Sequence, residues 1–143
     1  MSRANVLFLC GGNTARSQMA EAFLRKHGED RFEVFSAGLE PSEINPLTRK
    51  VMAEIGFDLS GQYSKGLEQF LDKEDFDYVI TVCGNADARC PFFPGKVVRM
   101  HWPFDDPASA EGTDEEKLGK FREIRNQIEQ KIKSWLSSPD LAL

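Results

Sequence analysis

Cys10, Arg16 and Ser17 are the residues of this sequence whose types and spacing could support a reaction. They belong to the run Cys-Gly-Gly-Asn-Thr-Ala-Arg-Ser at positions 10–17. A glycine-containing loop that leads into a helix presents consecutive backbone N–H groups to an anion, and the helix dipole strengthens this field. Arg16 adds a planar pair of donors that suits a tetrahedral oxyanion. Because groups that bind an anion also stabilise a thiolate, the run predicts a cysteine nucleophile inside an oxyanion pocket.

A cysteine at the end of a strand is more often an inert core residue, and its spacing from an arginine is by itself a weak signal. The surrounding sequence favours the catalytic interpretation, because a buried strand is expected before the loop and an amphipathic helix after it. The residues expected to line the oxyanion pocket are Gly11, Gly12, Asn13, Thr14, Ala15 and Arg16.

Strands and helices alternate along the chain on both sides of this loop. Apolar runs predict strands at Val6–Leu9, Phe32–Ser36, Asp77–Val82 and Lys96–His101, with a break at Ala37-Gly38 after the second. Helical patterns predict helices over Arg16–Gly28, Asn45–Gly56, Ser64–Leu71 and from Thr113 onward, where Thr113 and Glu116 form a capping box. The segment Gly84–Gly95 predicts a loop with one helical turn.

This alternation predicts an α/β fold of three layers, in which helices flank a four-stranded parallel sheet. The doubly wound strand order 2-1-3-4 fits four strands best. In that order the first and third strands are neighbours, so Cys10 and Cys83, at their carboxyl ends, would face one crevice. Cys90 lies on the loop that follows, and the three thiols would lead from the pocket to the surface.

The bulk composition indicates a single domain spanning residues 1–143, with 41% hydrophobic and 29% charged residues. No apolar run is long enough for a membrane span or a signal peptide, so we expect a cytoplasmic protein. A net charge of −5 argues against a nucleic-acid partner. Three cysteines do not form a secreted disulfide framework. Cys83, Cys90 and His101 lack the spacing of a zinc site, so no metal is expected.

The loop Cys10–Ser17, the Asp106-Pro107 pair and two further cysteines together resemble the arsenate reductases built on the low-molecular-weight protein tyrosine phosphatase fold. The resemblance covers nearly the whole chain. The loop alone would indicate only the wider phosphatase fold. Cys83 and Cys90 indicate the reductase branch.

This resemblance implies a role for each residue. Cys10 would attack arsenic, Ser17 would help hold it as a thiolate, and Asp106 would protonate the departing oxygen. Cys83 would then attack the Cys10 sulfur and expel arsenite, and Cys90 would move the disulfide to the surface. The implied reductant is external, either thioredoxin or glutaredoxin with glutathione, and no cofactor is bound. Phosphate and sulfate would compete with arsenate, and a monomer is expected.

Redox chemistry explains why additional cysteines are required. A phosphatase lets water attack the covalent intermediate, and no electrons move. Reducing As(V) to As(III) takes two electrons, which two thiols supply when they become one disulfide. A third thiol is needed because another protein cannot easily reach a disulfide deep in a pocket.

Two positions depart from the resemblance. Ala15 stands where many relatives carry another cysteine, which removes a competing thiol but no required step. Some relatives bind potassium through residues matching Asn13, Glu21 and Ser36, plus an aspartate at the position of Lys65. A lysine there would repel a cation. Our hypothesis is that its ammonium group occupies the space and bonds Asn13, Glu21 or Ser36 directly, and the alternative is a solvated lysine at a helix start.

Other interpretations of the site stay open at this point. Asp-Pro in a loop is often only a turn, and Asp105 could be the acid in place of Asp106. The chain could be a small tyrosine phosphatase in which Cys83 and Cys90 are bystanders, although Ala108 follows Pro107 where such phosphatases usually have an aromatic residue. A non-catalytic oxyanion or redox sensor is the third possibility.

Overall fold

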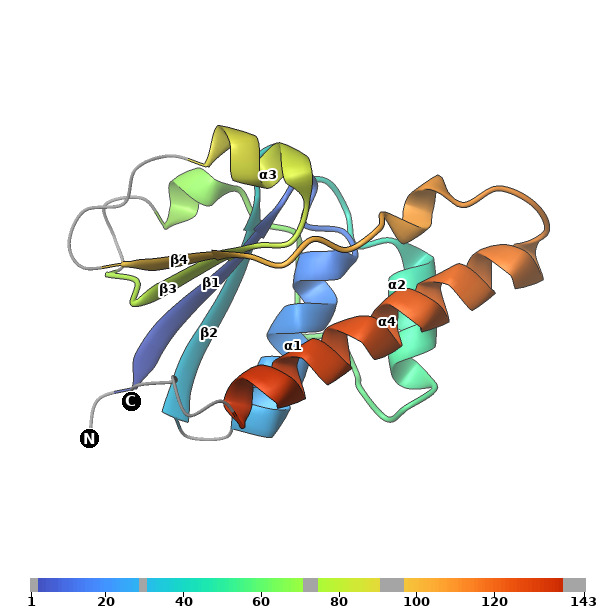
Figure 1. Cartoon of the computed structure of the whole chain (residues 1–143). Helices are drawn as coiled ribbons and strands as arrows, with labels where there is room; N and C mark the ends of the chain where they lie inside the picture. The colour runs from blue at the N-terminus through green and yellow to red at the C-terminus, as the bar shows by residue number, and fades with distance from the viewer. Residues whose placement is uncertain (1–2, 29–30, 71–74, 91–96, 138–143) are drawn as a thin grey trace.

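A four-stranded parallel sheet forms the centre of the fold in a computed structural model that describes residues 3–28, 31–70, 75–90 and 97–137 (Figure 1). The strands are β1 at Ala4–Cys10, β2 at Phe32–Gly38, β3 at Tyr78–Thr81 and β4 at Val98–His101. Their order is β2-β1-β3-β4, and all three pairings are parallel. The predicted strand order is confirmed, and it brings the carboxyl ends of β1 and β3 side by side.

Helices cover both faces of this sheet. They are α1 at Arg16–Gly28, α2 at Pro46–Ala53, α3 at Gly84–Arg89 and α4 at Asp114–Leu136, with short 3-10 helices η2 at Leu67–Gln69 and η3 at Pro107–Ser109. Figure 1 shows α1, α2 and α4 on one side of the sheet and α3 on the other, which confirms the three-layer fold. Within the described ranges, no helix combines the length and the apolar character needed to cross a membrane.

The core follows the predicted apolar pattern. The β1 residues 6–9 are fully buried, as expected for a strand covered on both faces. The apolar stripe of α4 is buried at Leu118, Phe121, Ile124, Ile128 and Ile132. The predicted capping box, in which Thr113 and Glu116 each bond the other's backbone, is present at the start of this helix.

Several predicted element boundaries are wrong, including those of β1 at Ala4–Cys10 and β3 at Tyr78–Thr81. Strand β2 does not break at Ala37 but continues to Gly38, which pairs with the last residue of β1. Ser64 caps no helix, because its hydroxyl donates to the Gly12 carbonyl and only the 3-10 turn η2 follows. Helix α2 ends at Ala53, three residues before the predicted end. The predicted positions Leu71, Lys96 and the end of the Gly84–Gly95 loop lie outside the described residues.

An ion-pair group joins α2 to α4. Glu54, next to the end of α2, accepts hydrogen bonds from Arg122 Nη2 at 2.7 Å and from Arg125 Nη1 at 2.9 Å. The hydrogen bonds from Arg122, aided by Arg125, lower the pKa of Glu54 from 4.5 to about 2. The folded chain therefore favours the ionised carboxylate, and this contribution to stability is present above pH 4.5 and lost as the pH falls toward 2.

We predict that Glu54→Gln lowers the free energy of unfolding at pH 7, and that its difference from the parent shrinks between pH 4.5 and 2. Urea unfolding at a series of pH values measures this difference. Glu111→Gln, which alters an exposed carboxylate before α4, is the matched control and should change little. A Glu54→Gln deficit that stays constant down to pH 2 would contradict the assignment.

Candidate active site

A pocket of about 310 Å³ opens at the carboxyl ends of β1 and β3. It is lined by Cys10, Gly11, Gly12, Thr14, Ala15, Arg16, Cys83, Asp106 and Ala108. Three segments far apart in the sequence thus meet at one place. Cys10 and Cys83 both line this pocket, as the predicted strand order requires, and both are thiols in this structure.

Backbone hydrogen bonds orient the loop between β1 and α1. The N–H groups of Leu39, Glu40, Ser42 and Asn45 donate over 2.9–3.2 Å to the carbonyls of Cys10, Gly11, Gly12 and Thr14, in that order. In a trans peptide the carbonyl and the N–H group point in opposite directions. Because the carbonyls point outward to residues 39–45, the N–H groups of the loop point toward the pocket. N–H groups that point inward in this way could bind an anion, so the arrangement is compatible with the predicted cradle.

The Cys10 sulfur lies against two donors at the floor of the pocket. Its Sγ is 2.9 Å from Ser17 Oγ and accepts a hydrogen bond from the backbone N–H of Asn13 at 3.2 Å. Ser17 Oγ itself accepts from Asn13 Nδ2 at 2.7 Å, so the Ser17 proton is available to the sulfur. Both groups are therefore placed to donate hydrogen bonds to the sulfur.

The Asn13 side chain forms hydrogen bonds with several neighbours of Cys10. Its backbone has φ 57°, the left-handed region that asparagine tolerates better than most residues. Its Nδ2 donates to Ser17 and, at 3.0 Å, to Ser36 Oγ. Its Oδ1 accepts from Gln18 Nε2 and from the Lys65 backbone N–H, each at 2.8 Å. Because both Nδ2 and Oδ1 form hydrogen bonds, the side chain stabilises a backbone conformation that is otherwise unfavourable.

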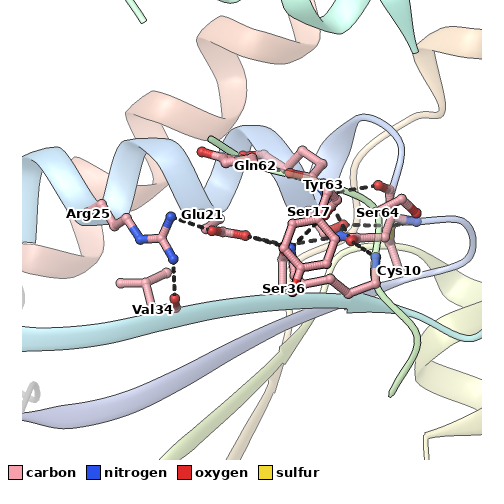
Figure 2. A network of polar contacts seen from close by, with 12 residues as sticks. Cys10, Ser17, Glu21, Arg25, Val34, Ser36, Gln62, Tyr63 and Ser64 are labelled. Atoms are coloured by element: carbon pink, nitrogen blue, oxygen red, sulfur yellow. Dashed lines mark hydrogen bonds and ion pairs between the residues drawn. The ribbon is translucent and has the colours of Figure 1, made fainter. Parts of the chain in front are cut away.

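A buried carboxylate extends the network away from the sulfur (Figure 2). Glu21 is 2% exposed and accepts a short hydrogen bond from the Ser36 hydroxyl. It also pairs with Arg25, which donates to the Val34 carbonyl at 2.9 Å. Because the Ser36 proton points to Glu21, Ser36 must accept from Asn13. The carboxylate therefore fixes the direction of the hydrogen bonds that lead to Cys10.

Lys65 is buried beside this carboxylate. Its ammonium lies 3.4 Å from Glu21 Oε1 and donates to the Tyr63 carbonyl at 2.7 Å. Burial lowers the pKa of Lys65, and the charge of Glu21 opposes that change. The predicted ammonium contact with Glu21 is present, whereas Asn13 is bonded through the Lys65 backbone. The alternative of a solvated lysine is wrong, since the side chain is 8% exposed.

Arg16 and Asp106 lie at the mouth of the pocket. Arg16 Nη1 donates to the Phe104 carbonyl at 3.0 Å, and Nη2 is 3.8 Å from Asp106 Oδ2. Asp106 caps η3, and its Oδ1 accepts from the Ala108 N–H at 3.0 Å. Asp105 instead pairs with Lys120 at 3.3 Å and does not line the pocket. The geometry therefore favours Asp106 over Asp105 as the acid.

Cys90 is separate from the pocket lining in this structure. It follows the last residue of α3, is half-buried and is a thiol. In the described part of the chain, no group of three or more His, Cys, Asp or Glu side chains is placed to hold a metal ion.

Sequence reasoning missed several polar residues that contact the loop. Gln18 and Thr48 are fully buried, and each donates to a loop carbonyl. A buried polar residue on an apolar helix face is a signal, because such a group requires a partner. The partner itself could not be identified, since Thr48 and Thr14 are far apart in the sequence.

Comparison with known proteins agrees with this geometry. The profile of the low molecular weight phosphotyrosine protein phosphatase family matches residues 5–141. An arsenate reductase of Halalkalibacterium halodurans is 47% identical over 135 residues, which cover 94% of this chain and 96% of that protein. A solved arsenate reductase in its oxidized state aligns with a TM-score of 0.77 at 33% identity, over 91% of this chain and 94% of the other. A thioredoxin-dependent arsenate reductase of Corynebacterium glutamicum aligns with a TM-score of 0.66 at 32% identity, over 95% of this chain and 64% of the other. The chain belongs to the low molecular weight phosphotyrosine protein phosphatase family and, within it, to the arsenate reductases.

Proposed function

We propose that this protein reduces arsenate to arsenite through Cys10, Cys83 and Cys90, with thioredoxin as the external reductant. One observation carries the proposal: Cys10 and Cys83 line the same pocket, together with residues of the oxyanion loop. A phosphatase needs only the first of these thiols. Two thiols at one oxyanion site can supply two electrons to the bound atom.

The first step forms a bond between Cys10 and arsenic. The thiolate attacks As(V), while the loop amides and Arg16 hold the remaining oxygens. One arsenate oxygen that already carries a proton takes a second proton from Asp106, which lies at the mouth of the pocket, and leaves as water. No electron has moved to arsenic at this stage.

The second step is the reduction. The Cys83 thiolate attacks the Cys10 sulfur, the electron pair of the sulfur–arsenic bond passes to arsenic, and arsenite leaves as As(III). A disulfide between Cys10 and Cys83 remains. Cys90 then attacks Cys83, which forms a Cys83–Cys90 disulfide and regenerates the Cys10 thiolate.

This last exchange requires α3 to change shape. Cys83 and Cys90 flank the six-residue helix Gly84–Arg89. Seven helical steps of about 1.5 Å separate their Cα atoms by about 10 Å. A disulfide needs Cα atoms about 5.5–6 Å apart. So short a helix is only marginally stable by itself, and unwinding it would bring the disulfide to the surface.

An external dithiol protein completes the cycle by reducing the Cys83–Cys90 disulfide. The thioredoxin-dependent reductase of C. glutamicum, which this chain resembles, favours thioredoxin over glutaredoxin with glutathione. We place this chemistry in the cytoplasm, where thiols are kept reduced.

Arsenate turnover with the two donor systems side by side tests the proposal. We expect many equivalents of arsenite per chain with thioredoxin, thioredoxin reductase and NADPH, and slower turnover with glutaredoxin and glutathione. Inorganic phosphate and sulfate should compete with arsenate. Absence of arsenite with both donors would overturn the proposal.

A phosphatase is the alternative that the pocket supports, because Cys10, Arg16 and Asp106 would also suit a phosphate ester. The small Ala108 side chain lines the rim where an aromatic residue would hold an aryl group, so we propose only residual hydrolysis. Hydrolysis of p-nitrophenyl phosphate that is unaffected by Cys83→Ala, with no arsenite formed, would favour the phosphatase. Tight anion binding with no product in either assay would favour a sensor.

We also propose that Lys65 replaces a potassium ion beside Glu21. Its ammonium already places a positive charge 3.4 Å from this buried carboxylate, in addition to the charge of Arg25. The thermal midpoint and arsenate turnover of the parent should therefore be the same in KCl and in NaCl. Lys65→Asp adds a carboxylate and removes the ammonium, so this variant should regain stability in KCl relative to NaCl. A parent that depends on potassium would contradict this role.

A further inference from the structure

We propose that Ser64, Gln18 and Thr48 are positioning residues, each of which fixes one peptide plane of the oxyanion loop so that its N–H group faces either the Cys10 sulfur or the bound oxyanion. The inference rests on the proposed function, because it concerns how strongly the same pocket binds its substrate. It adds residues from outside the Cys10–Ser17 loop to the machinery that binds the anion.

Ser64 holds the peptide between Gly12 and Asn13. Its hydroxyl donates to the Gly12 carbonyl at 2.9 Å and accepts from the Ser42 N–H at 3.0 Å. The other end of the same peptide is the Asn13 N–H, which donates to the Cys10 sulfur at 3.2 Å. Ser64 thus acts on the sulfur through one rigid peptide plane.

Gln18 holds the next peptide. It is fully buried on α1, and its Nε2 donates to the Asn13 carbonyl at 3.1 Å and to Oδ1 of the same residue at 2.8 Å. These two hydrogen bonds hold both the backbone carbonyl and the side chain of Asn13, whose backbone is in the left-handed conformation. With the carbonyl held outward, the Thr14 N–H at the other end of the peptide faces the pocket.

Thr48 holds the third peptide, from helix α2. Its Oγ1 donates to the Thr14 carbonyl at 3.0 Å, beside the Asn45 N–H that donates to the same oxygen at 3.1 Å. The side chain is fully buried. Thr48 thereby orients the Ala15 N–H, and it ties the loop to an element that contributes no residue to the pocket lining.

These three contacts hold the peptide planes of a loop of mostly small residues. An N–H group contributes to anion binding only if it is already oriented when the anion arrives. If the outer donor is removed, the buried carbonyl loses a hydrogen bond and the peptide plane gains freedom to rotate. Losing one such hydrogen bond is worth about a fivefold change in affinity.

Thr48→Val and Thr48→Ser form a matched pair for the test. Valine keeps the shape of threonine and removes the donor, whereas serine keeps the donor. Protection of Cys10 from iodoacetamide by inorganic phosphate gives the dissociation constant of the anion. We expect Thr48→Val to raise this constant and the KM for arsenate about fivefold, with a smaller change in kcat. Thr48→Ser should recover most of the affinity.

The thermal midpoint of each variant separates loss of fold from loss of orientation. Should Thr48→Val fail to fold, Ser64→Ala supplies the same measurement at a half-buried site. Equal phosphate affinity in the parent, Thr48→Val and Ser64→Ala would overturn the inference while leaving the proposed function intact. A parent in which phosphate gives Cys10 no protection would overturn both.

Discussion

A Cys90→Ala variant should reduce one equivalent of arsenate per chain and then stop, with a disulfide between Cys10 and Cys83. Its two remaining cysteines line the same pocket, so the electron transfer to arsenic is possible. Cys10 and Cys83 are only 3% and 7% exposed. A disulfide between them would therefore be out of reach of a second protein. Steady turnover should fall on the order of 10⁴-fold, the scale for losing a reacting group.

Cys83→Ala should stop one step earlier. Cys10 can still attack arsenic, but no neighbouring thiol attacks its sulfur, so no arsenite is released and a covalent arsenic adduct remains. Mass spectrometry of the intact chain distinguishes the two variants, since Cys90→Ala should lose the mass of two hydrogen atoms and Cys83→Ala should gain arsenic. If both variants turned over at the parent rate, the relay would be wrong even with Cys10 as the nucleophile.

Gly38→Ala should disable the pocket without touching a reacting group. An added Cβ would lie 2.8 Å from the Asn13 nitrogen and 2.8 Å from the Gly11 oxygen. Both are backbone atoms, which cannot rotate away as a side chain can. We expect a loss of about 1–3 kcal/mol of stability from overpacking. We expect at least about a hundredfold loss of arsenate turnover, because the loop amides must move.

Gly119→Ala is the matched control for this substitution. Gly119 is exposed within α4, and an added Cβ would meet no atom within 4 Å. The variant should gain about 0.5–1 kcal/mol of stability and keep full turnover. Urea unfolding and arsenate turnover of both variants give the comparison. If Gly38→Ala turned over arsenate like Gly119→Ala, the close packing of β2 against the loop would not matter for catalysis.

The strand order could be predicted from the sequence because apolar runs and helical patterns alternate strictly. The same local signals gave wrong boundaries where a residue serves a distant contact. Gly38 suggests a strand break, yet its missing Cβ lets β2 approach the loop. Ser64 suggests a helix cap, yet its hydroxyl donates to the carbonyl of Gly12, which is 52 residues away in the sequence.

The residues of the candidate site likewise include some that the sequence predicts and some that it does not. Cys10 and Arg16 could be found because they lie close together in one loop, and Cys83 because the strand order carries it to the same edge. The donors Gln18 and Thr48 act on carbonyls, and no sequence pattern records which carbonyl a side chain reaches. Long-range side chain to backbone contacts therefore mark the limit of what the residues alone predicted.

The outward-facing carbonyls of the loop have a consequence for redesign. If the pocket binds anions through main-chain N–H groups, as we propose, exchanging the half-exposed Thr14 side chain should reshape the entrance while leaving the anion-binding N–H groups in place. A library at this position could thus be screened for larger or smaller oxyanions at little risk to the underlying chemistry.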